Sequence, residues 1–200
     1  MNKIHRLSIL LIALFSFNTS FAQSPMKEPV SFKLKNGLTV VVAQNVGLGK
    51  IYSRLTIENQ TDDSQKVAAQ VLENFLSNKA TKFNEGMLEN GKPVARVTMT
   101  FNEANAATNI TTFEQTLSFV SNAFINPEIT KEAFDEMKSA YTGNKADLAS
   151  ITIKDLQDFY NKNFKAADTY ITIAGDITPS AAKLITNRVF GDWKTETTAL

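Results

Sequence analysis

The sequence contains no cysteine and only one histidine, His5, among its 200 residues. The absence of cysteine excludes disulfides, thiolate metal sites and cysteine nucleophiles. His5 lies within residues 1–22, which have the features of a signal peptide, so we expect the processed chain to contain no imidazole. Such a chain can form neither a serine or cysteine hydrolase triad of the usual kind nor a zinc site that depends on histidine.

The predicted signal peptide combines a positive start, an apolar stretch and a small-residue cleavage site. Lys3 and Arg6 supply the charge, residues 7–17 are the apolar stretch, and residues 20–22 form the cleavage site. We therefore expect an exported protein, periplasmic or secreted. The stretch is too short for a permanent transmembrane helix, and a lipoprotein anchor would need a cysteine, so the sequence predicts no transmembrane anchor.

Neither sign of charge predominates, because the sequence contains 21 Lys and Arg residues and 20 Asp and Glu residues. Proteins that bind nucleic acid show a basic surface, so this balance argues against a nucleic-acid partner. Residues 23–200 are enough for one domain with a hydrophobic core and too few for two domains of ordinary size. The sequence therefore predicts a single domain over residues 23–200.

Hydrophobic alternation with a period of two predicts six β-strands, and apolar spacing near 3.6 predicts the helices. The strands cover residues 31–35, 38–42, 50–58, 95–101, 104–111 and 169–174. The helices cover residues 64–77, 81–88, 112–125 and 130–149, a segment that starts with the capping-box-like Thr152-x-x-Asp155, and residues 179–190. Asn36-Gly37 favours a two-residue type I′ hairpin turn. Because strands and helices are grouped, we expect an α+β fold with an antiparallel sheet of about six strands backed by helices.

Two segments resemble the pitrilysin/insulinase (inverzincin) metallopeptidases, a family that includes the mitochondrial processing peptidases. Residues 32–42 (FKLKNGLTVVV) are similar to the family's opening hairpin. Residues 153–193 are more specific, because the pairs DL and FY, the strand ITIAGD and the closing FGDW follow in the family's order and spacing. The resemblance implies a metallopeptidase-like domain of the mitochondrial processing peptidase/LuxS type. In characterised relatives two such domains enclose a peptide in a clam-shell cleft.

The family's catalytic motif is H-x-x-E-H on the first helix, where two histidines bind zinc and the glutamate activates water. The corresponding residues here are Gln70, Glu73 and Asn74. The spacing i, i+3, i+4 keeps the three side chains on one helix face, but neutral amides are poor ligands for zinc. The third ligand, a glutamate on a later helix, falls near Gly143 or Asn144. The resemblance therefore implies a domain without catalytic residues, metal or cofactor, in which Gln70, Glu73 and Asn74 are vestigial.

Other notable residues have simpler explanations. Glu73 is interpreted as a solvated residue rather than as a working general base. Tyr160 and Trp193 are expected to pack in the core or at a domain edge rather than to contact a peptide. The acidic residues of the segment from Glu132 to Glu136 are expected to form a solvated helix face, because they lack the loop spacing of a calcium site.

Three functions remain open at this point. The leading hypothesis is a non-catalytic subunit that completes or regulates a peptide-binding chamber with a related zinc-bearing metallopeptidase. The alternative is a self-sufficient structural or binding module, such as a homodimer, and the third is an active zinc metalloendopeptidase. Because peptides in this family add to a sheet edge, residues 104–111 are the predicted exposed strand for a bound peptide.

Overall fold

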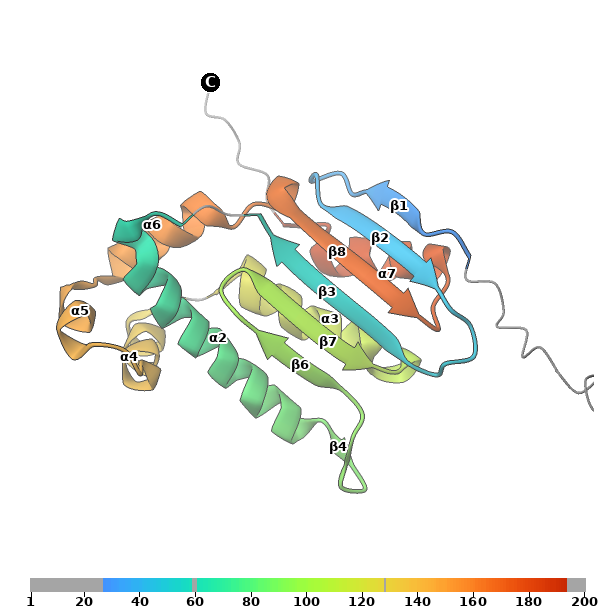
Figure 1. Ribbon diagram of the computed structural model, residues 1–200, viewed down its shortest axis with the longest axis horizontal. Helices are drawn as coiled ribbons and strands as arrows, with labels where there is room; N and C mark the ends of the chain where they lie inside the picture. Colours follow the sequence, from blue (N-terminus) through green and yellow to red (C-terminus); the bar gives the residue numbers. More distant parts are fainter. Residues whose placement is uncertain (1–26, 59–60, 128, 194–200) are drawn as a thin grey trace, which may run out of the picture.

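A single six-stranded sheet organises the chain (Figure 1). The computed structural model describes residues 27–58, 61–127 and 129–193, so the predicted signal peptide, residues 1–22, lies outside the described residues. The strands, in their order across the sheet, are β1 (Val30–Lys33), β2 (Thr39–Gln44), β8 (Thr169–Gly175), β3 (Ile51–Ile57), β7 (Glu103–Thr108) and β6 (Arg96–Met99). The predicted α+β class, with about six strands backed by helices, is confirmed.

The sequence predicted an antiparallel sheet, but one of its strand pairs is parallel. Strands β2 and β8 pair in parallel, whereas the other four pairings within the described residues are antiparallel. Strand β8 follows several helices rather than a hairpin turn. A crossover of that length allows a strand to return in the direction of its neighbour, which a short hairpin cannot do.

Within residues 27–58, 61–127 and 129–193, the helices leave one face of the sheet uncovered. They are α2 (Lys66–Gly86), α3 (Ile110–Ile125), α4 (Lys131–Ala140), α5 (Lys145–Ser150), α6 (Ile153–Asn163) and α7 (Pro179–Phe190). Figure 1 looks onto the uncovered face, with α3 and α7 behind the sheet and α2 beside β6. The burial of side chains along β3 shows the same two faces, because Ile51 and Leu55 are buried while Tyr52 and Arg54 are exposed. None of the described helices is long and apolar enough to span a membrane.

Helix α2 is longer than the sequence predicted. Residues 64–77 and 81–88 were expected to form two helices, but one helix runs from Lys66 to Gly86. Ala80 is buried and Phe83 stacks on Phe119 of α3 with ring centroids 4.2 Å apart, so the apolar stripe continues through the expected break. After Gly86 the chain forms a small hairpin of β4 (Leu88–Glu89) and β5 (Lys92–Pro93).

The single helix predicted over residues 130–149 is divided in the structure. Helix α4 ends at Ala140, Tyr141 is extended with φ −71° and ψ 124°, and α5 begins at Lys145. The Tyr141 hydroxyl donates a hydrogen bond to Gln70 Oε1 of α2 over 3.3 Å. The interruption between α4 and α5 thus coincides with a contact between distant segments of the chain. The spacing of the apolar residues in this segment does not predict it.

The Asn36-Gly37 turn also differs from the prediction. A type I′ turn requires positive φ at both central residues, but here only Gly37 has one, at +95°. The Gly37 N–H instead donates to the Leu34 carbonyl, and the Asn36 amide points inward, donating to the carbonyls of Phe190 (2.7 Å) and Trp193 (3.2 Å). Positive φ at both central residues, as a type I′ turn requires, occurs instead at Asn90-Gly91 between β4 and β5.

The core lies between the sheet and the helix layer. Fully buried side chains come from both layers: Leu38, Ile51, Ile57, Leu72, Leu76, Phe113, Leu117, Phe124, Met137, Leu156, Phe159 and Phe190. Trp193 is also buried, with 4 % of its surface exposed, and Tyr160 stacks on Phe164 with ring centroids 4.7 Å apart. Core packing therefore accounts for both aromatic residues, as the sequence predicted.

Candidate functional site

Helix α2 presents Gln70, Glu73 and Asn74 next to a hollow beside its first turns. The apolar positions of α2, including Val71 and Leu72, are buried. That packing turns Gln70 to solvent and leaves Glu73 and Asn74 partly exposed. The hollow has a volume of about 360 Å³ and is lined by Thr61, Lys66, Ala69, Gln70, Glu73 and Phe101. Two of the three predicted vestigial residues thus line one hollow.

Asn74 differs from the other two. It does not line the hollow, and its Nδ2 is buried without a hydrogen-bond partner among the described residues. A buried N–H donor that lacks an acceptor costs about 1–3 kcal/mol. An amide N–H group offers a cation no lone pair, so this nitrogen cannot act as a metal ligand.

The donor set does not fit the zinc ion that the family resemblance implies. Zinc prefers imidazole, thiolate and carboxylate ligands, and only Glu73 belongs to one of these classes. The Gln70 carbonyl oxygen already accepts the hydrogen bond from Tyr141. Within the described part of the chain, no group of three or more His, Cys, Asp or Glu residues is placed to hold a metal. The correspondence of Gln70, Glu73 and Asn74 with H-x-x-E-H stays a prediction, but a set with one carboxylate and two neutral amides lacks the three ligands that catalytic zinc needs.

The segment between α4 and α5 lies near α2, where the third ligand was expected. The Tyr141 contact brings this linker to Gln70, and Gly143 follows two residues later. A side chain at Gly143 would collide with Tyr141, because an added Cβ would lie 2.3 Å from its hydroxyl oxygen. Neither Gly143 nor Asn144 carries a carboxylate, so the linker brings no anionic ligand to the hollow.

The acidic residues of α4 are engaged with lysines. Asp135 pairs with Lys131 over 2.6 Å, and Glu136 pairs with Lys82 of α2 over 2.5 Å. The hydrogen bond from Lys82 lowers the pKa of Glu136, and hydrogen bonds at the start of α4 lower the pKa of Glu132. These side chains are exposed, so they form a solvated helix face, as predicted.

The uncovered face of the sheet carries a second and larger hollow, of about 530 Å³. Its lining residues come from β3, β6, β7 and β8: Tyr52, Ser53, Arg54, Arg96, Thr98, Asn105, Ala106, Ala107, Thr172 and Ala174. Small side chains form its floor, since Ala107 and Ala174 flank Tyr52 on the neighbouring strands. The alternating pattern of the sequence predicted two-faced strands but gave no sign that this face would lack a covering layer.

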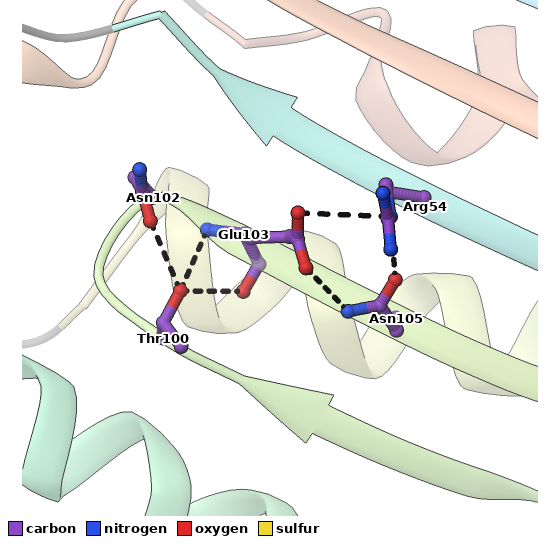
Figure 2. Close-up of polar contacts among 5 residues, drawn as sticks. All are labelled: Arg54, Thr100, Asn102, Glu103 and Asn105. Atoms are coloured by element: carbon purple, nitrogen blue, oxygen red, sulfur yellow. Dashed lines mark hydrogen bonds and ion pairs between the residues drawn. The ribbon is translucent and has the colours of Figure 1, made fainter.

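A polar network holds Arg54 on this face (Figure 2). Arg54 Nε donates to Asn105 Oδ1 over 2.8 Å and lies 3.6 Å from the Glu103 carboxylate. Asn105 Nδ2 in turn donates to Glu103 Oε1 over 2.6 Å. At the neighbouring β6–β7 turn, Thr100 accepts a hydrogen bond from the Glu103 N–H over 3.1 Å. The network fixes the position of one cationic group above the hollow.

The strand predicted to accept a peptide is not at an edge. Residues 104–111 were expected to form an exposed strand, but β7 lies between β3 and β6 and pairs with both. Its backbone groups are therefore used on both sides. The segment is also shorter than predicted, because Asn109 caps α3, which begins at Ile110. The edge strands of this sheet are β1 and β6.

Comparison with known proteins supports the fold. Residues 150–199 match the family model described as the Peptidase M16 inactive domain. The periplasmic protease PqqL from Escherichia coli has a TM-score of 0.66 at 15% identity, covering 90% of this chain and 25% of its own. The peptidase M16 inactive domain from Pseudomonas fluorescens has a TM-score of 0.64 at 15% identity, with coverages of 84% and 52%.

Pitrilysin itself is also similar in structure. Its TM-score is 0.66 at 12% identity, over 90% of this chain and 24% of pitrilysin. No curated protein sequence matches the chain. The chain thus spans between about a quarter and about half of the length of these solved structures. It has the fold of the pitrilysin/insulinase-type M16 peptidase domains, and its residues 150–199 match the model of that family's inactive domain.

Proposed function

We propose that this chain is an exported, non-catalytic M16 domain that completes a peptide-binding chamber with a zinc-bearing relative. The inactive-domain match and the amide side chains on α2 support the non-catalytic part. Export rests on the predicted signal peptide and agrees with the periplasmic location stated for PqqL. The observation that carries the partner role is the uncovered face of the sheet.

The open face offers a partner a hollow whose floor consists of small side chains. Four of the residues that the strand register places on the open face are charged: Lys33, Arg54, Arg96 and Glu103. The others are mainly small, hydroxyl-bearing or aromatic: Ser31, Thr39, Val41, Ala43, Tyr52, Thr56, Thr98, Asn105, Ala107, Tyr170, Thr172 and Ala174.

Capture from the native exported fraction tests the proposal. The tagged processed chain is the bait, and recovered proteins are identified by mass spectrometry. Thr172→Glu places a charge on the open face, and Asn122→Glu, at an exposed position of α3 on the helical side, is the matched control. We expect the wild type and Asn122→Glu to recover an M16 relative that contains H-x-x-E-H, and Thr172→Glu to lose it. Recovery of no such relative and no peptide by the wild type would refute the proposal.

The alternative partner is a second copy of the chain, because the open faces of two copies can also pack against each other. Sedimentation of the purified processed protein separates the two cases. A stable homodimer that Thr172→Glu dissociates and Asn122→Glu does not, together with no affinity for the zinc-bearing relative, would establish the homodimeric module instead.

A further inference from the structure

Strand β6 lies at an edge of the sheet. The backbone N–H and C=O groups of its successive residues point alternately toward β7 and away from the sheet. The Thr100 N–H just after the strand donates to the Glu103 carbonyl on the β7 side, over 2.8 Å. By the same alternation Arg96 and Thr98 bond to β7, and the N–H and C=O of Val97 point away from the sheet. An unpaired edge of this kind is a template on which another extended chain can add.

The side chain of Asn84 occupies this outward position. Asn84 lies in the last turn of α2, which packs beside β6. Its Oδ1 accepts a hydrogen bond from the Val97 N–H over 2.7 Å, and its Nδ2 donates to the Val97 carbonyl over 2.8 Å. Both distances are typical of well-formed N–H···O bonds. One carboxamide thus satisfies both backbone groups of one edge residue.

We propose that Asn84 seals the β6 edge against strand addition. A carboxamide has the donor and acceptor of a peptide group, so Asn84 makes with Val97 the pair of bonds that a residue of an added antiparallel strand would make. Strand β6 spans only Arg96–Met99. Because Asn84 already occupies the backbone groups of Val97, an incoming strand could bond only to Met99, the other residue of β6 whose backbone groups face outward. One such residue cannot hold a strand in register.

The seal has a consequence for how the chain recognises other molecules. Strand addition supplies affinity through repeated main-chain hydrogen bonds. With Val97 occupied, a peptide or partner must contact the open face through side chains rather than extend the sheet at β6. The proposal concerns the chain by itself and holds whether or not a metallopeptidase relative binds the open face.

Amide hydrogen exchange of the processed protein tests the seal directly. The measured quantity is the exchange rate of the Val97 amide divided by that of the adjacent Thr98 amide, which faces β7. Loss of global stability changes both rates, whereas loss of the seal changes the Val97 rate alone. In Asn84→Ala we expect this ratio to rise about five- to tenfold, in keeping with the loss of one partly buried hydrogen bond.

The matched control is Asn163→Ala. Asn163 is buried, and its Nδ2 donates to the Phe159 carbonyl over 2.8 Å within α6, away from any sheet edge. We expect this variant to lose stability without a change in the Val97 to Thr98 ratio. Asn84→Leu, which keeps the approximate volume of the side chain, repeats the test if Asn84→Ala fails to fold.

Sedimentation over a range of concentrations gives the second readout. The freed edge of Asn84→Ala is expected to produce self-association beyond that of the wild type, and Asn163→Ala is not. The proposal is overturned if the wild-type Val97 amide exchanges as fast as the Met99 amide. It is overturned equally if folded Asn84→Ala and Asn84→Leu associate no more than the wild type does.

Discussion

Replacement of Tyr160 by phenylalanine tests whether this aromatic residue is structural. The Tyr160 hydroxyl donates to the carbonyls of Phe124 and Ile125, with both oxygens 2.7 Å away. These carbonyls belong to the last turn of α3, where the helix itself provides no donors. Tyr160→Phe keeps the ring that stacks on Phe164 and removes only the hydroxyl. We therefore expect a loss of about 1–2 kcal/mol in the free energy of unfolding.

Tyr141→Phe is the matched control. Its hydroxyl makes one longer bond, 3.3 Å to Gln70 Oε1, at an exposed position. We expect this variant to lose no more than about 0.5 kcal/mol, as is usual for surface changes. Urea unfolding followed by circular dichroism measures both variants, with an unchanged denaturant slope as the sign that only stability differs. Equal midpoints for the two variants would refute the structural role of the Tyr160 hydroxyl.

The same pair of variants yields a pH dependence. Burial raises the pKa of the Tyr160 hydroxyl above its ordinary value of 10.0. The unfolded state therefore loses the proton first as the pH rises, so the contribution of Tyr160 is complete below pH 10 and declines above it. We expect the stability difference between the wild type and Tyr160→Phe to narrow in that range. A difference that grows with pH would contradict the assigned environment.

Three further outcomes are expected. Asn36→Leu should cost about 2–4 kcal/mol in urea unfolding, because it leaves the carbonyls of Phe190 and Trp193 without their buried donor. Gly175→Ala should cost at least about 2 kcal/mol in the free energy of unfolding or prevent folding, because φ at Gly175 is +131° and an added Cβ would lie 2.1 Å from the Lys50 carbonyl oxygen. A variant as stable as the wild type would refute the claim that a side chain is strained at this position. The processed chain should hold no stoichiometric zinc by elemental analysis and should keep its melting temperature in chelator, whereas one tightly bound zinc per chain with chelator-sensitive peptide cleavage would establish an active peptidase.

Sequence reasoning succeeded where the determining contacts are local. The Thr152-x-x-Asp155 pattern predicted the start of α6, and both capping-box hydrogen bonds are present. Pro179 stands in the first turn of α7, as its missing N–H favours. Each of these features depends on residues a few positions apart, so the pattern contains all of the information that it needs.

The errors occurred where a distant segment decides the outcome. Asn36 does not adopt the positive φ that an Asn-Gly pair favours, and its side chain instead bonds to carbonyls more than 150 residues away. Residues 104–111 do form a strand, but its interior position depends on the pairing of β6 beyond it. Likewise, nothing near Asn84 in the sequence indicates that its amide meets the backbone of Val97.

The sequence by itself determined the chemistry that is available and most of the local elements. No thiol or imidazole remains once the predicted signal peptide is removed, and the apolar periods place the strands and helices. Tertiary structure alone decided which strands lie at the edges, which face of the sheet is uncovered and which side chain closes β6. These features depend on the order in which elements far apart in the chain pack together, and such an order leaves no periodic trace in the residues themselves.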